Sequence, residues 1–78
     1  LRVDGHTDND PIATAKFPSN WELSTARALS VVHTLIKAGI PAKRLAATGF
    51  GEHYPLTSGS NEIAKAKNRR IELKFTQR

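Results

Sequence analysis

Hydrophobic and polar positions alternate at both ends of this 78-residue chain, in the pattern typical of β-strands. Residues 1–5 alternate apolar and polar side chains and stop at a glycine, which predicts a half-buried strand. Residues 70–75 alternate throughout. The apolar positions expected to face inwards there are Ile71, Leu73 and Phe75, with Arg70, Glu72 and Lys74 facing outwards. We therefore expect one strand at each end of the chain.

A helical pattern is clearest in residues 20–38. Ser19 and Glu22 fit the S-x-x-E capping box, in which a serine caps the helix and a glutamate reaches back to it. Gly39 and Pro41 then end the helix. The apolar stripe expected to pack inwards is Trp21, Leu29, Val32, Leu35 and Ile36.

The remaining pattern is weaker. Residues 44–50 predict a short strand, residues 51–60 a loop rich in Gly, Ser and Pro, and residues 61–68 a short helix. The order β-α-β-α-β indicates an α/β fold, an α+β sandwich in which helices cover one face of a single sheet. We expect residues 1–78 to form one small domain, whose core is marginal at this length.

Composition and charge limit the classes of binding partner that we expect. Twelve Lys and Arg against seven Asp and Glu give a net charge of +5, which favours anionic partners. The charges are scattered, however, and the densest run, at residues 65–70, is not interleaved with aromatic side chains as a surface that stacks bases would be. We therefore expect no binding of nucleic acid. Cysteine is absent, which excludes disulfides and thiolate chemistry.

Residues 5–28 carry most of the candidate chemistry. Asp8 and Asp10 resemble an acid–base pair, but both lie in one polar turn, where Asp usually bonds its own backbone. A calcium loop fails because Ile12 occupies the third ligand position, and the histidines share no metal-ligand spacing. We therefore expect no catalytic residues, no metal and no cofactor. A hydrolase remains the alternative to a binding module.

Binding of a charged ligand is the remaining function to consider for residues 5–28. Arg27 lies two turns into the predicted helix, where surrounding side chains could hold its guanidinium as a fork for a carboxylate. Asp8 follows the first strand, and Asn20 starts the helix with both a donor and an acceptor. An acid and an arginine that face one cleft suit a zwitterion. The alternatives are that Asp8 and Arg27 pair with each other, or that Arg27 is a solvated helix residue.

Four motifs in order resemble the OmpA-like C-terminal domain. They are GHTD at residues 5–8, NWELS with ARA between residues 20 and 28, GFGE with a proline at residues 49–55, and NRRIE at residues 68–72. The resemblance covers nearly the whole chain. Within the family, the long segment that ends in FPSNWELS is most similar to the MotB-type stators of the flagellar motor. The family fold is an α/β sandwich of a mixed sheet with helices on one face, in agreement with the pattern above.

The resemblance implies a function. Domains of this family anchor bacterial envelope proteins to peptidoglycan by binding the diaminopimelate of the stem peptide, whose side chain ends in an amine and a carboxylate. By matching motif, Asp8 would bind the ammonium, Arg27 would hold the carboxylate, and Asn20 would support that same carboxylate. Thr7 and Leu23 would form walls. Either Arg69 or Arg70 would add a further contact; the alternation of the strand does not say which.

The resemblance also sets expectations about the parent protein. Family domains usually carry another strand and helix before the GHTD strand, so we expect residues 1–78 to be an N-terminally incomplete domain. The parent would lie in the periplasm, attached through an upstream segment to the inner membrane, as a stator is, or to the outer membrane, as other family branches are. A homodimer is compatible with the sequence.

Overall fold

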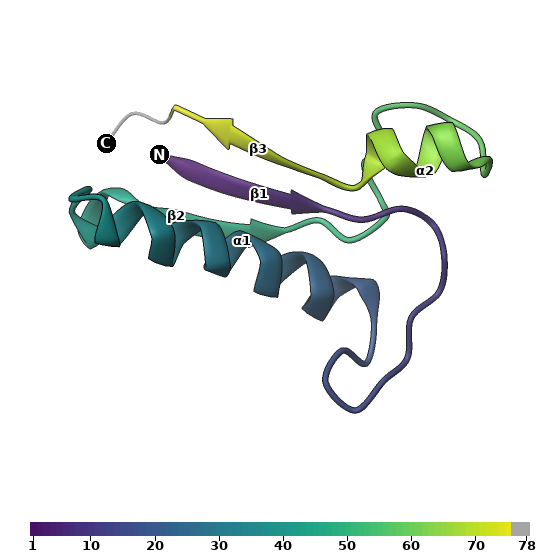
Figure 1. Ribbon diagram of the computed structural model, residues 1–78, viewed down its shortest axis with the longest axis horizontal. Coiled ribbons are helices and arrows are strands. Elements are labelled where there is room, and N and C mark those ends of the chain that lie inside the picture. Colours follow the sequence, from purple (N-terminus) through teal and green to yellow (C-terminus); the bar gives the residue numbers. More distant parts are fainter. Residues whose placement is uncertain (76–78) are drawn as a thin grey trace.

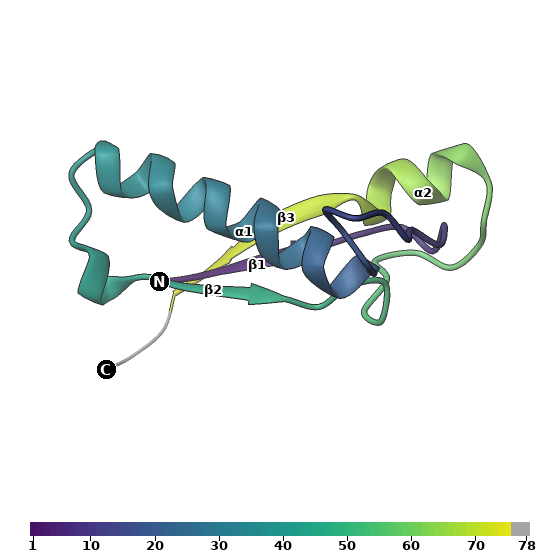
Figure 2. The ribbon, with the colours of Figure 1, turned by 90° about the horizontal axis from the view of Figure 1, so that it is seen from below.

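The computed structural model describes residues 1–75 and contains a three-stranded sheet with two α-helices (Figure 1). The elements are, in order, β1 (Arg2–His6), α1 (Asn20–Lys37), the 3₁₀ helix η1 (Ala42–Arg44), β2 (Ala46–Gly49), α2 (Glu62–Asn68) and β3 (Arg70–Lys74). In Figure 2 both α-helices lie above the strands as drawn, α1 along the sheet and α2 beyond its end. The α/β fold predicted from the sequence is therefore confirmed.

The sheet is mixed, with strand order β2-β1-β3. Strand β1 runs parallel to β2, with Gly5 opposite Gly49, and antiparallel to β3, with Val3 opposite Leu73. Strand β1 is central. The residues just after its C-terminal end therefore lie between the segment that leaves β2 and the segment that enters β3. The polar loop that follows β1 starts at this point.

Helix α1 packs on β1 and β2 through small residues. Ser24 and Ala28 are fully buried, and they lie one turn apart on the helix. A methyl group at Gly5 would lie 2.1 Å from the carbonyl oxygen of Ser24, and one at Gly49 would lie 2.1 Å from Oγ1 of Thr25. The two glycines thus let the helix backbone rest directly on the sheet.

The predicted apolar stripe of the helix is wrong in part. Trp21, Leu29 and Ile36 are exposed, and only Val32 and Leu35 of the stripe are half-buried. The face that meets the sheet is centred on Ser24 and Ala28 instead. Close backbone contact leaves no room for large side chains, so the large apolar residues lie to the side of the interface.

The inward face predicted for the last strand also needs correction. Ile71 is half-buried, whereas Leu73 is 52% exposed and Phe75 is exposed. Their pairing with β1 places Ile71 and Leu73 on the side of the sheet that faces α1. However, β3 is an edge strand, and α1 packs on β1 and β2. The apolar side chains of β3 therefore extend past the helix.

The helix ends follow the sequence closely. Ser19 caps α1 by accepting a hydrogen bond from the Trp21 amide at 3.1 Å, and its hydroxyl donates to Glu22. Gly39 takes a positive φ of 106° just after the helix. Within residues 1–75, neither α-helix combines the length and the apolar character that a membrane span requires.

Candidate functional site

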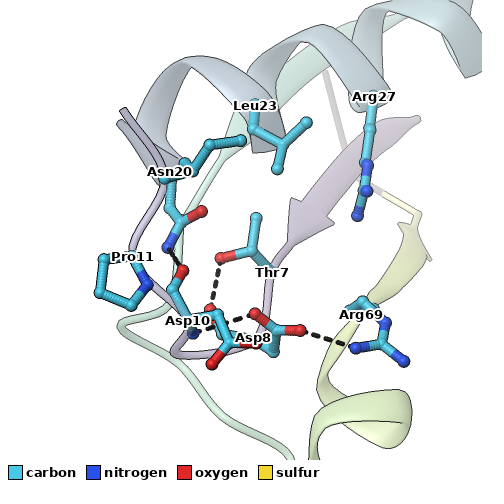
Figure 3. A pocket seen from close by; sticks show the side chains of 9 residues that line it. Thr7, Asp8, Asp10, Pro11, Asn20, Leu23, Arg27 and Arg69 are labelled. Atoms are coloured by element: carbon cyan, nitrogen blue, oxygen red, sulfur yellow. Dashed lines mark hydrogen bonds and ion pairs between the residues drawn. The ribbon is translucent and has the colours of Figure 1, made fainter. Parts of the chain in front are cut away.

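A polar cavity of about 190 Å³ lies where the loop after β1, the first turns of α1 and the end of α2 meet (Figure 3). Its lining residues are Thr7, Asp8, Asp10, Pro11, Ile12, Asn20, Leu23, Arg27 and Arg69. Six of the seven residues expected at a ligand site are among them. Arg70, the seventh, lies elsewhere. The structure thus brings distant parts of the sequence together around one space.

Helix α1 contributes one side of the cavity. Asn20, Leu23 and Arg27 are spaced by three and four residues, so they follow one another along a single helix face. In Figure 3 their side chains all point from the helix towards the loop after β1. Leu23 separates the amide of Asn20 from the guanidinium of Arg27, and gives the cavity its apolar wall.

Asp8 lies on the opposite side and is held by two hydrogen bonds. Its Oδ1 accepts from the Asp10 amide at 3.0 Å, and its Oδ2 accepts from Nη1 of Arg69 at 2.7 Å. Burial by itself would raise the pKa of Asp8, but these hydrogen bonds and the charges of Arg69 and Lys65 outweigh it and lower the pKa. Asp8 is therefore a carboxylate at neutral pH.

Arg27 has no such partner. Among residues 1–75 its guanidinium makes no hydrogen bond or ion pair, although it lines the same cavity as Asp8. The two side chains do not pair with each other, because Asp8 is paired with Arg69. Asp10, the other acid of the lining, pairs with Lys65 at 2.8 Å. Arg27 is thus the unpaired charge of the cavity lining.

Asn20 is fixed as an acceptor, which differs from the role that the resemblance implied. Its Nδ2 donates to the Asp10 carbonyl at 3.0 Å and to Oε1 of Glu52 at 3.2 Å, so both amide hydrogens are used. Its Oδ1 accepts no hydrogen bond within the described part of the chain. Asn20 therefore has no free donor for a carboxylate. Apart from the place of Glu52 in the GFGE motif, no local pattern indicates its contact with Asn20.

Arg69 and Arg70 are neighbours that point to different regions. Asn68 ends α2 and holds the preceding loop, because its Oδ1 accepts from the amides of Leu56 and Thr57. Arg69 follows and reaches Asp8. Arg70 starts β3 and pairs with Glu72 at 2.5 Å on the other side of the sheet. Arg69, not Arg70, therefore lines the cavity.

The arrangement of the lining residues suits ligand binding better than catalysis. The acids of the lining, Asp8 and Asp10, are both ion-paired, and the pKa of Asp8 is lowered, whereas a general acid needs a raised one. No group of three or more His, Cys, Asp or Glu residues in positions 1–75 is placed to hold a metal ion. What the cavity offers is a carboxylate on one wall and an unpaired guanidinium on the other.

Comparisons with known proteins agree with this fold. Residues 1–69 match the OmpA family. Motility protein B of Bacillus subtilis is 42% identical over 72 residues, which are 91% of this chain and 28% of that protein. The chain thus spans less than a third of that relative.

Two solved structures are also similar. The C-terminal domain of Helicobacter pylori MotB has a TM-score of 0.90 at 30% identity, covering 99% of this chain and 58% of that one. The cell wall anchor of the Pseudomonas aeruginosa type VI secretion system (T6SS) has a TM-score of 0.82 at 41% identity, covering 90% of this chain and 49% of that one. In sequence and in fold, this chain belongs to the OmpA family.

Proposed function

We propose that this domain is a non-catalytic module that binds peptidoglycan through the diaminopimelate of the stem peptide and so anchors an envelope protein to the cell wall. The observation that carries the proposal is the cavity that Asp8 and Arg27 share, in which Arg27 has no partner among the described residues. A ligand that ends in both an ammonium and a carboxylate complements these two groups. The family relationship with a cell wall anchor supports the same ligand class.

In the proposed complex Asp8 accepts hydrogen bonds from the ammonium, and the guanidinium of Arg27 holds the carboxylate as a fork. Thr7 and Leu23 form walls, and Arg69 remains close enough to Asp8 to share it with the ligand. Hydrogen bonds to charged groups contribute about 1.5–3 kcal/mol each. A contact with two such groups gives modest affinity per site, so firm attachment requires several copies of the domain.

We further propose that the parent protein is a MotB-like stator of the flagellar motor, anchored in the inner membrane with this domain in the periplasm. The 42% identity to motility protein B supports this assignment. The alternative is a wall anchor outside the motor, held in the outer membrane or in another envelope assembly. The similarity to the T6SS cell wall anchor favours that alternative.

Sedimentation with purified cell wall sacculi tests the binding function. We expect the domain to sediment with sacculi, and Asp8→Ala and Arg27→Ala each to abolish this while the circular dichroism spectrum stays unchanged. Lys37→Ala is a matched control, because Lys37 is an exposed cation at the far end of the same helix. Loss of binding that always accompanies unfolding would instead assign Asp8 and Arg27 a structural role.

The same incubation tests the non-catalytic assignment. We expect no soluble wall fragments to accumulate in the supernatant over hours with the wild-type domain. Sustained release of fragments, absent from a matched incubation with Asp8→Ala, would contradict a pure binding module.

A further inference from the structure

At one end of the cavity the polar side chains can only accept hydrogen bonds from a ligand. Their own N–H and O–H groups already donate to other atoms of the protein. Both hydrogens of Asn20 Nδ2 are donated, to the Asp10 carbonyl and to Glu52. Both of these partners are acceptors, so the nitrogen must face them, and the oxygen must face the other way. In Figure 3 the oxygen of Asn20 points away from Asp10, into the space beside Thr7.

Thr7 and Asp8 complete this end. The hydroxyl of Thr7 donates its proton to the Asp8 carbonyl at 2.9 Å, so towards the cavity Oγ1 can only accept. Each carboxylate oxygen of Asp8 accepts one hydrogen bond and retains a further lone pair. Thr7 and Asn20 are both more than nine-tenths buried, which fixes their orientation. We call Thr7 Oγ1, Asn20 Oδ1 and the Asp8 carboxylate the acceptor cluster.

We propose that the acceptor cluster recognises an unsubstituted primary ammonium, and that Glu52 is the positioning residue that orients Asn20 for it. The inference rests on the proposed function and deepens it, because it states the chemical form of the amine that the site accepts. Glu52 lines a neighbouring cavity rather than this one, so it would act on the ligand only through Asn20.

The acceptor cluster matches a primary ammonium both in the number of hydrogen bonds and in charge. A primary ammonium carries three N–H donors and a positive charge, and the cluster supplies three acceptor groups of which one is a carboxylate. An acylated nitrogen has one N–H and no charge, so it leaves two buried acceptors without donors. A reaction that forms an amide at this nitrogen would therefore remove the ligand from the site. The domain would bind stem peptides whose side-chain amine is still free.

Two variants of Glu52 test its role as the residue that orients Asn20. Glu52→Gln keeps a side-chain oxygen that can accept from Asn20 Nδ2, so the orientation of Asn20 persists. Glu52→Leu removes that acceptor, and the amide of Asn20 can then turn its nitrogen towards the cavity. The N–H groups of that nitrogen would face the N–H groups of the ammonium. Because two donors cannot bond each other, binding of the ammonium would weaken. The leucine variant should lose part of the selectivity for the free amine, and the glutamine variant should keep all of it.

The first measurement compares two synthetic probes by NMR titration. One is a stem tripeptide that ends in diaminopimelate with a free side-chain amine, and the other is its N-acetyl derivative. For the wild-type domain we expect the free amine to bind about tenfold tighter or more. We expect Glu52→Gln to keep this ratio and Glu52→Leu to lower it by about threefold, because the cluster loses one acceptor while the charge of Asp8 remains.

A second measurement follows Asn20 directly and does not depend on ligand. In the wild type we expect both side-chain amide protons of Asn20 to exchange slowly with solvent, because both are hydrogen-bonded in a buried position. In Glu52→Leu one of them should exchange quickly, whereas Glu52→Gln should protect both. Fast exchange in the wild type would overturn the assigned orientation, even if all variants fold.

The outcomes separate the two proposals. Equal binding of the two probes by a wild-type domain that still sediments with sacculi would overturn the acceptor cluster and leave the wall-binding function standing. An unchanged probe ratio in Glu52→Leu would overturn the role of Glu52 alone. Failure of the wild type to bind either probe or sacculi would overturn the proposed function, and the inference with it.

Discussion

Two regions of this small domain gather charged side chains, and they use them differently. One is the cavity between α1 and the loop after β1. The other, which we call the charged face, is the side of the sheet away from α1, and it consists of Arg2, Asp4, His6, Arg70, Glu72 and Lys74. On the charged face Glu72 lies between two cations, and Asp4 is paired with Arg2 at 2.7 Å.

The difference lies in what each region leaves unpaired. On the charged face every acid and every cation within residues 1–75 has a partner. In the cavity Arg27 lacks one, and the acceptor cluster faces open space. Density of charge alone therefore does not distinguish a binding site from a structural network. Unpaired groups that face a cavity do, because a ligand can satisfy them.

His6 is the exception on the charged face. Its Nδ1 is buried without a hydrogen-bond partner among residues 1–75, and its ring stacks on Phe50 with centroids 5.2 Å apart. Burial lowers the pKa of His6, with the positive charge of Arg70 adding to the effect. The ring is packed under the aromatic side chain rather than open to a cavity, so we assign it a structural role.

The largest expected effect breaks both regions together. Gly5→Ala places a methyl group 2.1 Å from the carbonyl oxygen of Ser24, and a backbone atom cannot move aside as a side chain can. We expect a loss of about 3 kcal/mol or more in the free energy of unfolding, measured by urea denaturation. Gly39→Ala is the control, because nothing lies within 4 Å of its added methyl group and only the positive φ costs about 1–2 kcal/mol. Equal costs for the two variants would contradict the close helix–strand contact.

Acid should weaken the charged face in two stages. The unfolded chain takes up a proton on His6 near pH 6.5, whereas the folded chain resists it, so stability should begin to fall below that pH. The hydrogen bonds from Arg70 and Lys74 lower the pKa of Glu72 from 4.5 to about 2. Stability from Glu72 is therefore present above pH 4.5 and should be lost as the pH falls towards 2. Denaturation across this pH range measures both stages, and Glu72→Gln should reduce the lower one, to which Asp8 also contributes through its lowered pKa.

Two arginine variants should give opposite results. Arg27→Gln removes a charge that has no partner among residues 1–75, so we expect binding to sacculi to fall by about tenfold or more, while the free energy of unfolding changes by less than about 0.5 kcal/mol. Arg70→Gln breaks hydrogen bonds to Glu72 and to the carbonyls of Asn68 and Tyr54, so we expect a loss of about 1–2 kcal/mol in stability and unchanged binding. The same pattern for both variants would erase the distinction between the two regions.

The smallest expected effect is at the edge of the charged face. Lys74 is half exposed and contacts Glu72 at 3.1 Å, while Arg70 holds the other oxygen of that carboxylate. Surface ion pairs of this kind contribute about 0–1 kcal/mol. Lys74→Ala should therefore change stability by about 0.5 kcal/mol or less and leave wall binding unchanged. A loss as large as that of Arg70→Gln would mean that the face acts as one cooperative network.

Much of the fold could be predicted from local signals. The capping residues Ser19 and Gly39 mark the ends of α1, and the alternating segments became β1 and β3. The buried face of α1 could not be predicted. Periodicity follows large apolar residues such as Trp21 and Leu29, whereas the true interface uses Ser24 and Ala28 against glycines that lie far away in sequence.

The candidate site shows a similar division. Helical spacing alone is enough to bring Asn20, Leu23 and Arg27 onto one side of α1, because they follow one another at intervals of three and four residues. The pairing of Asp8 with Arg69 joins residues 61 positions apart. No local pattern could therefore choose between Arg69 and Arg70, or reveal that Glu52 orients Asn20.

The contact between the Ser24 carbonyl and Gly5 has a mechanical consequence. In the proposed complex, a ligand held at Asp8 and Arg27 would pull on the segment after β1 and on α1 at the same time. Because these two elements touch through main-chain atoms, sliding one along the other would require the helix to lift off the sheet first. Tension on the ligand would then be carried by main-chain contacts rather than by deformable side chains, as the proposed anchoring function requires.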